Sequence, residues 1–487
     1  MDFVSGMALA TDIRPYQSIA PEVAYTAGCR TETPRRTACF SAMQIRKLRI
    51  ARYAPLLPGV RRKRNNHTVA PGKRGVHVMA STFTWLDYSE SDRQKMQDVL
   101  DQLGERTTRD ELGIGGIRDA FAELLFPGTT TIQTAAKYFL FVPWMYVQLE
   151  QKYVPSKDVL AIARKFEAEL SKTLSDDEDV DGIIGRRAGE NLKRTASSVY
   201  WQGLLKWGIR TFPGSQDSYH RSLDKLYLRR KGRAESKTEF DGEGSDGAGV
   251  HNWHPNLIDP DTSFPKTASL KLAKHEAIYL RERVLSNCDG SLLAYLLKHP
   301  GHVEGVDFAW HLEMSLNPQS LLAEQLKHGQ NFSEVMHGAQ LLYNLILAEQ
   351  SLNADKTAEY RERLMEWWTV VEKRRSDFND WNRIEFWRIV DRSMHRVSGA
   401  ARTFVTKWID MAMSVSSAED VIDSEQMRQL IIDREFQIKR SLARTSNQHA
   451  RELWSGAAGS EQMDLRWRTS RRIITDILRG LQENVDA

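Results

Sequence analysis

Apolar residues recur every three or four positions along most of the chain after residue 89. Met96, Val99 and Leu103 form the first such stripe, and Gly104 follows it. This spacing places apolar side chains on one face of an α-helix, whereas a strand would require strict alternation, which does not recur here. The pattern therefore predicts a mainly α, multi-helix protein.

The same periodicity predicts where the other helices lie. One long segment is expected to begin at Thr129, Thr130 and Thr131, to bend at Pro143 and to extend through Tyr153. The remaining stripes are expected at residues 117–125, 155–170, 197–207, 272–285, 292–297, 332–352, 360–371, 381–390, 404–413 and 473–481. Each stripe provides the apolar face that a helix needs to pack against a neighbour.

A Gly-rich segment divides the chain into two units. Residues 232–249 contain five glycines among charged residues, which predicts a linker. It separates an N-terminal helical domain at 79–231 from a C-terminal helical domain at 250–487. Within the first domain, short helices around 197–209 are compatible with a small winged-helix or helix-turn-helix element, and also with an αα corner that only packs.

The first 78 residues differ from the rest in composition. They contain fourteen Lys or Arg against four Asp or Glu and no Trp, with basic clusters at 35–36 and 61–64. This composition predicts a disordered basic extension at 1–78, upstream of a natural start at Met79. A basic arm for nucleic acid and a nuclear-type address at 61–64 are the other interpretations. Residues 79–487 carry a net charge of −6, so global charge does not indicate a polyanionic partner.

Cysteine use and hydropathy favour a cytoplasmic protein. Cys288 is the one cysteine after residue 78, so no disulfide framework can form there. The longest apolar run, 138–147, has ten residues and contains Pro143. It is shorter than the roughly 20 residues that cross a bilayer. We therefore expect no membrane partner.

Histidine pairs come nearest to a metal-binding pattern. His251 and His254 form one pair, and His299 and His302 form another. A proline beside each pair prevents the continuous helix that would align both imidazoles on one ion. The chain also lacks a phosphate-binding loop and a nucleophile elbow. We expect no metal and no cofactor.

A first candidate anion site follows the turn at 126–128. A helix that begins at Thr129, Thr130 and Thr131 would present free N–H groups and hydroxyls, with Lys137 about two turns further on. Such helix starts bind phosphates and carboxylates in other proteins. An ordinary helix cap without a ligand is the alternative.

A second candidate binding segment is the basic helix at 466–479. Arg466, Arg468, Arg471 and Arg472 are expected to face solvent, because apolar residues between 473 and 481 occupy the buried face. A face of this kind contacts phosphates, so DNA is a predicted partner. A solvated helix surface is the other interpretation.

A dense charged cluster precedes both segments. Arg109, Asp110, Glu111, Arg118 and Asp119 lie within eleven positions. Grouped carboxylates and arginines are the candidate catalytic residues of a nuclease or hydrolase. Ion-paired helix caps would explain the same residues without catalysis. The two interpretations differ in whether the carboxylates converge in a cleft.

Several sequence blocks resemble a known bacterial family. The block at 107–119 and the run FPGTTTIQTAAKYFLFVPW at 126–144 are similar to the family of unknown function DUF6361, with weaker similarity at 200–210 and 466–478. The resemblance covers nearly all of 79–487, which supports the start at Met79. It implies no established activity. It does imply an association with helicase, phospholipase-D-like or restriction genes of bacterial defence systems.

Three functions follow as hypotheses. The first is a DNA-associated accessory component of a defence or DNA-processing system, with helicase or nuclease subunits as partners. The second is a nuclease or hydrolase with an unfamiliar site of carboxylates and arginines. The third is a protein-only scaffold, which the acidic body and the Trp-rich C-terminal domain would suit. The basic helix favours the first.

Overall fold

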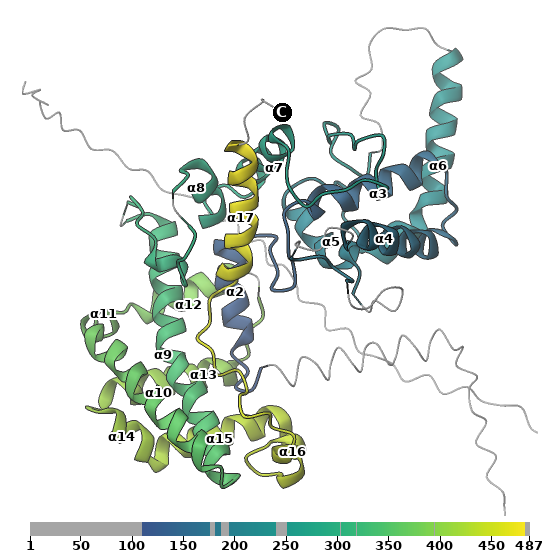
Figure 1. Cartoon of the computed structure of the whole chain (residues 1–487). Helices are drawn as coiled ribbons and strands as arrows, with labels where there is room; N and C mark the ends of the chain where they lie inside the picture. The colour runs from purple at the N-terminus through teal and green to yellow at the C-terminus, as the bar shows by residue number, and fades with distance from the viewer. Residues whose placement is uncertain are drawn as a thin grey trace, which may run out of the picture. The chain divides into compact units, whose positions relative to one another are not determined.

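The computed structural model describes residues 110–175, 181–186, 194–239, 251–301, 303–317, 319–393 and 395–482. They all belong to one compact unit that runs from Leu86 to Ala487. Helices account for 65% of the described residues, and no strand occurs among them. The predicted mainly α, multi-helix fold is therefore confirmed (Figure 1).

The part of the chain before residue 240 contains one group of helices. They are α2 (Gly115–Leu125), α3 (Tyr138–Gln151), α4 (Val159–Ser175), α5 (Ala196–Lys206) and α6 (Gln216–Glu239). Helix α3 contacts both α4 and α5. Trp207, at the end of α5, stacks on Phe139 of α3 with 3.7 Å between ring centroids. Aromatic packing of this kind fixes the two helices against each other.

The remaining helices follow residue 250. They are α7 (Lys274–Asn287), α8 (Leu292–Lys298), α9 (Leu321–Gln350), α10 (Ala354–Lys373), α11 (Arg375–Asn379), α12 (Arg383–Arg392), α13 (Gly399–Ser414), α14 (Ala418–Asp423), α15 (Glu425–Lys439), α16 (Gln448–Glu452) and α17 (Trp467–Gln482). Short 3₁₀ turns lie at Ala309–His311 and Arg440–Leu442.

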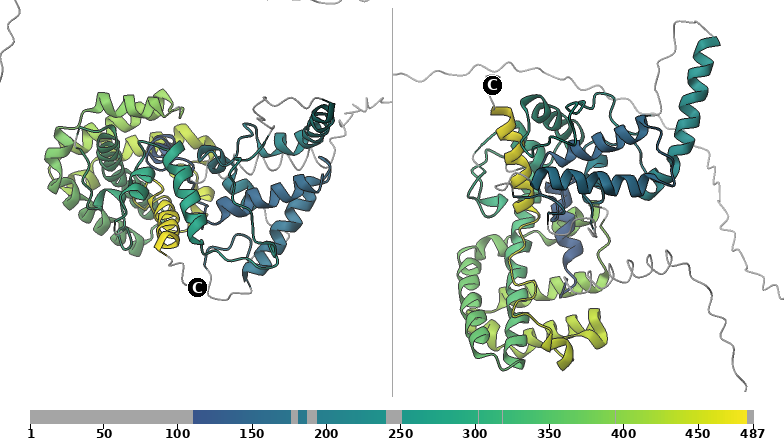
Figure 2. Two further views of the ribbon diagram at one scale, coloured as in Figure 1. Left: turned by 90° about the horizontal axis from the view of Figure 1, so that it is seen from above. Right: turned by 45° about the vertical axis from the view of Figure 1, so that its right-hand side comes forward.

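Helix α9 forms the core of the C-terminal part. It has thirty residues, and the Ser320 hydroxyl caps its start by accepting a hydrogen bond from the Ala323 N–H. Apolar residues occur on all its sides, so it is buried around most of its circumference. It packs against α2, α10, α13 and α15, and Figure 2 shows α9 and α10 side by side.

Helix α17 is amphipathic and packs on α7 and α8. Its buried residues are Trp467, Ser470, Ile473, Ile474, Ile477 and Gly480. The Asp464 carboxylate caps the helix by accepting hydrogen bonds from the N–H groups of Arg466 and Arg468, at 3.0 and 2.9 Å. Gly480 permits the close approach to α7, because a Cβ there would lie 2.8 Å from the Ala277 Cβ.

Helix α5 packs into the interior. Its buried residues are Ala196, Ser197, Val199, Tyr200, Trp201, Gly203 and Leu204. Only Ser198, Gln202 and Lys206 are exposed along it. A recognition helix needs a free polar face to enter a DNA groove. On α5 that face consists of Ser198, Gln202 and Lys206, and Lys206 pairs with Glu123 at 3.1 Å, so the αα corner and the helix-turn-helix or winged element both stay predictions.

Several expected helix boundaries differ from the observed ones; α9, for example, begins at Leu321, well before the expected start at residue 332. The segment expected to be helical from Thr129 becomes helix only at Tyr138, because residues 129–137 form turns at 131–132 and 136–137 and irregular backbone between them. Helix α6 continues to Glu239, into the predicted linker at 232–249. The expectations for 1–78, Met79, Arg109 and the rest of the linker lie outside the described residues.

Candidate functional site

The charged cluster at 110–119 surrounds the start of α2. Asp110 accepts hydrogen bonds from the N–H groups of Ile114 and Gly115, at 2.9 and 2.8 Å. These are N–H groups that a helix start leaves without partners, so Asp110 acts as a helix cap. Arg118 pairs with Asp119 at 3.0 Å, and both side chains are about one third exposed.

Glu111 is buried and paired with two cations. Its carboxylate forms ion pairs with the Lys439 ammonium and with the Arg444 guanidinium, the latter at 2.8 Å. The Tyr343 hydroxyl lies 3.4 Å from the same carboxylate. A buried carboxylate is stable only when such partners replace its hydration shell. The arrangement therefore joins residue 111 to the end of α15.

A second buried carboxylate, Glu435 of α15, lies next to the first. Its side chain is fully buried and accepts hydrogen bonds from the Tyr343 hydroxyl at 2.7 Å and from the N–H groups of Arg444 and Thr445 at 2.9 Å each. The Thr445 hydroxyl donates a further bond at 2.7 Å. Burial, together with the charge of Glu435, raises the pKa of Tyr343 well above its ordinary value. Tyr343 thus remains protonated and can act as the shared donor.

Arg434 holds the backbone that follows Glu111. Its guanidinium donates to the carbonyl oxygens of Leu112 and Gly113, at 2.9 and 3.2 Å. Gly113 has a positive φ of 61°, and a Cβ there would lie 2.5 Å from the Arg434 Nη2. Only glycine combines this backbone conformation with so close a neighbour. Gly113 is therefore explained by packing.

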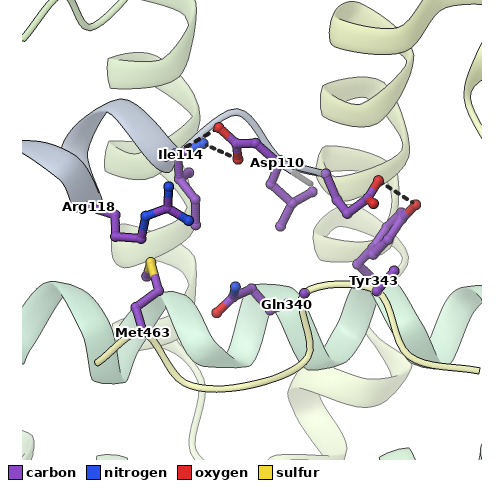
Figure 3. A pocket seen from close by; sticks show the side chains of 11 residues that line it. Asp110, Ile114, Arg118, Gln340, Tyr343 and Met463 are labelled. Carbon is purple, nitrogen blue, oxygen red and sulfur yellow. Dashed lines mark hydrogen bonds between the residues drawn. The ribbon is translucent and has the colours of Figure 1, made fainter. Parts of the chain in front are cut away.

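The cavity beside this segment is small. It encloses about 30 Å³ and is lined by Asp110, Glu111, Arg118, Gln340, Tyr343 and Met463, among others (Figure 3). A space of that size holds only a few water molecules, so a nucleotide or sugar does not fit. Asp110, Glu111 and Arg118 do come together, but Asp110 and Glu111 are engaged with protein partners.

The candidate anion site at Thr129 to Thr131 has a different structure from the one expected. Thr129 is buried and donates its hydroxyl to the Phe126 carbonyl at 2.8 Å. The Lys137 ammonium is buried against Glu276 and donates to the Lys271 carbonyl at 3.2 Å. The expectation of a helix start with free N–H groups and a nearby free cation is wrong, because α3 begins only at Tyr138.

The predicted set of solvent-facing arginines also changes. Arg466 is 14% exposed, forms an ion pair with Glu123 at 3.1 Å, and donates to the Thr129 carbonyl at 2.7 Å. Leu465 and Arg466 have left-handed backbones, with φ of 51° and 70°, so Arg466 lies outside the helical phase of α17. The expectation that it faces solvent is wrong.

The other three predicted arginines remain at the surface to different degrees. Arg468 and Arg472 are exposed on α17. Arg471 is half-buried and donates to the Val306 carbonyl at 2.5 Å. Asp476, on the inner side of the helix, accepts a hydrogen bond from the Ala136 N–H at 2.8 Å. Burial raises the pKa of Asp476 to about 6.

Arg479 completes the outer face of α17 and was not among the predicted residues. Its side chain is 68% exposed and forms an ion pair with the exposed Glu304 at 2.7 Å. One face of α17 is formed by positions three or four residues apart, namely 468, 472, 475, 479 and 482. That face consists of Arg468, Arg472, Thr475, Arg479 and Gln482, without an acidic residue. We call it the α17 basic face. Its periodicity was visible in the sequence.

The residues that surround Glu111 could not be found in the same way. Tyr343, Glu435, Lys439 and Arg444 follow Glu111 by more than two hundred residues. One sequence carries no signal that pairs positions so far apart, whereas helix periodicity is local.

The described residues contain no group of three or more His, Cys, Asp or Glu placed to hold a metal ion. His254 lies beside Tyr279 and Arg283, at 3.4 Å from the tyrosine hydroxyl. Burial, and then the charge of Arg283, lowers its pKa. Among the helices described, none is long and apolar enough to span a membrane.

Residues 80–479 match the family of unknown function DUF6361. The match covers most of the chain, so the protein belongs to this family, as the blocks at 107–144 indicated. No curated protein and no solved structure matches the chain. The family assignment therefore brings no activity with it.

Proposed function

We propose that this protein is a DNA-associated accessory component that binds the phosphate backbone through the α17 basic face. The observation that carries the proposal is the alignment of Arg468, Arg472 and Arg479 on one exposed side of a helix whose other side is firmly packed. A rigid helix reduces the entropy lost when the side chains engage a ligand.

The spacing of these arginines suits a phosphate backbone. Residues 468 and 479 are eleven positions apart, which corresponds to roughly 16 Å along a helix. Guanidinium groups bind phosphate oxygens in a bidentate manner and remain charged at any physiological pH. Backbone contacts of this kind carry no sequence information. The proposed binding is therefore independent of DNA sequence.

The use of the charged cluster favours a binding component over an enzyme. Asp110 caps a helix, Glu111 is paired with two cations, and Asp119 is paired with Arg118. Each of these roles is structural. The nuclease or hydrolase alternative would need a carboxylate that reaches a substrate. Helicase or nuclease subunits as partners, and a place in a defence system, rest on the family resemblance alone.

The test is the affinity of the full chain for a duplex, measured by fluorescence anisotropy. The variant R468A/R472A/R479A should bind roughly 100- to 1,000-fold more weakly at about 0.1 M salt, because three phosphate contacts are lost. The matched control is R388A/R392A/K407A, which removes three exposed cations from α12 and α13. The control should bind as the wild type does. Equal losses in both variants would contradict the proposal.

Should the wild type show no salt-sensitive affinity for duplex DNA, the scaffold hypothesis would take first place.

All variants keep residues 1–78, so any contribution of that basic segment is the same in each. The comparison between variants therefore reports on α17 alone.

A further inference from the structure

An exposed tyrosine occupies a position at the end of α3 where glycine is usual. The N–H groups of Tyr153 and Val154 donate to the carbonyl oxygens of Glu150 and Leu149, at 3.1 Å each. This is the Schellman arrangement, whose left-handed residue is most often glycine. Tyr153 has φ 52° and is 62% exposed. The helix end itself does not explain a tyrosine here, since a left-handed backbone is unfavourable for residues with a Cβ.

The loop that carries Tyr153 is fixed to α6. The Tyr153 ring packs edge to face on Tyr227, with 5.2 Å between centroids, and the Tyr227 hydroxyl donates to the Val154 carbonyl at 3.1 Å. Ser156 and Asp224 exchange two hydrogen bonds, at 3.0 and 3.1 Å. These contacts with α6 therefore hold the loop of Tyr153 in one position before any ligand binds.

Several cations lie close to the two tyrosines along the chain. Lys152 and Lys157 lie on the same loop, and Lys231 lies one helical turn after Tyr227 on α6; all three are exposed. Arg230 is held beside them by an ion pair with Glu150 at 2.6 Å.

Glu150 itself adds no accessible negative charge. It is buried and accepts further bonds from Tyr219, Asn252 and Trp253, at 2.6, 2.9 and 3.1 Å. Two exposed acids belong to the segments 151–158 and 224–231. Asp224 accepts a hydrogen bond from the Ser156 N–H, and Asp158 directly follows Lys157 in the chain. Along these two segments, the cations therefore outnumber the acids.

We propose that Tyr153, Lys152, Lys157 and Lys231 form a binding surface for single-stranded nucleic acid. A base would stack on the free side of the Tyr153 ring, and the lysines would contact the flanking phosphates. Exposed aromatic rings among cations are the pattern that single-strand binders share. This surface goes beyond the proposed duplex contact and does not depend on α17.

An anionic membrane is a second ligand that attracts lysines and tyrosines. Membrane binding requires apolar side chains that enter the lipid. The exposed neighbours of Tyr153 along the chain are mostly polar or charged: Gln151, Lys152, Lys157 and Asp158. Exposed apolar side chains occur as well, at Pro155, Leu160 and Leu228. The cations and the aromatic ring favour nucleic acid, and the vesicle measurement below tests the membrane.

The decisive variant is Tyr153→Gly in the full chain. Glycine suits φ 52°, so the helix end should persist while the ring is lost. Affinity for an oligothymidylate should fall by about 5- to 100-fold, the effect of losing one stacked base. Tyr153→Phe keeps the ring and should retain the affinity.

The chain offers a matched control for the backbone change. Leu352, after α9, has φ 53° and is 92% exposed, with the same pair of hydrogen bonds at 3.1 and 3.0 Å. Leu352→Gly should leave oligothymidylate binding unchanged. A wild-type affinity in Tyr153→Gly, or an equal loss in Leu352→Gly, would overturn the proposal.

Two further measurements separate the alternatives. R468A/R472A/R479A should weaken duplex binding and leave oligothymidylate binding nearly unchanged, whereas Tyr153→Gly should do the reverse. If the proposal for one surface is contradicted, the proposal for the other can still be tested. Binding of the protein to vesicles with about one third anionic lipid tests the membrane alternative. Binding to vesicles that depends on Tyr153, without binding to the oligonucleotide, would overturn the single-strand proposal.

Discussion

The segment at 110–119 and the α17 basic face are both rich in charge, but the protein uses the two differently. Glu111 lies in the interior against Lys439 and Arg444, whereas Arg468 and Arg472 remain in solvent. Burial of a charge is unfavourable unless a partner replaces water, so buried charges are paired. The comparison shows that dense charge in a sequence does not by itself indicate chemistry. What matters is whether the folded chain already supplies the partners.

The largest expected effect concerns Glu111. Glu111→Gln leaves the buried Lys439 and the partly buried Arg444 without their common anion, so the free energy of unfolding should fall by about 3–5 kcal/mol. The measurement is chemical denaturation followed by circular dichroism. The double variant Glu111→Gln/Lys439→Met removes one of the stranded cations and should lose clearly less than the single variant. A single variant as stable as the wild type would contradict the structural role of the cluster.

The inner side of α17 provides an effect of intermediate size. The pKa of Asp476 is raised from 3.8 to about 6, so the folded state binds this proton more tightly than the unfolded state does. Its contribution to stability is therefore fully present below pH 3.8 and is lost as the pH rises through 6, amounting to about 2–3 kcal/mol.

Asp476→Asn keeps an acceptor for the Ala136 N–H but does not titrate. Relative to the wild type, this variant should become more stable as the pH rises from about 4 to 7. Unfolding curves at several pH values measure the difference. A difference that does not change with pH would show that Asp476 titrates normally.

The smallest effect separates two neighbouring arginines. Arg466→Ala removes the partner of Glu123 and a donor to Thr129, so it should destabilise the fold by about 1–3 kcal/mol. Arg468→Ala removes an exposed charge and should alter stability by less than about 1 kcal/mol. Thermal unfolding of both variants tests the distinction. Equal changes in stability for the two variants would contradict the distinction between a paired, partly buried Arg466 and an exposed Arg468.

The features that the sequence predicted are those set by local periodicity. The apolar stripe from Ile473 to Ile477 identified the buried side of α17, and it is buried. The position of Arg466 could not be predicted from that stripe, because two left-handed residues precede the helix. The start of α3 was placed too early, since three threonines resemble a cap but Thr129 bonds back to Phe126 instead.

The contacts of the candidate site could not be predicted from local periodicity. Asp110 and Glu111 were recognised from their density. Asp110 caps the adjacent helix start, but the partners of Glu111 lie elsewhere in the chain. Whether a carboxylate is free or paired depends on tertiary contacts, here with Lys439 and Arg444. No local pattern encodes such contacts.

The central claim is that the α17 basic face engages phosphates, with Arg479 exchanging its exposed partner Glu304 for a phosphate. The most direct measurement is the dependence of duplex affinity on salt concentration, for the full chain and for R468A/R472A/R479A. Each phosphate contact contributes about 0.9 to the slope of log K against log salt, so the variant's slope should be shallower by roughly 2.7. Identical slopes for the two proteins would contradict the claim.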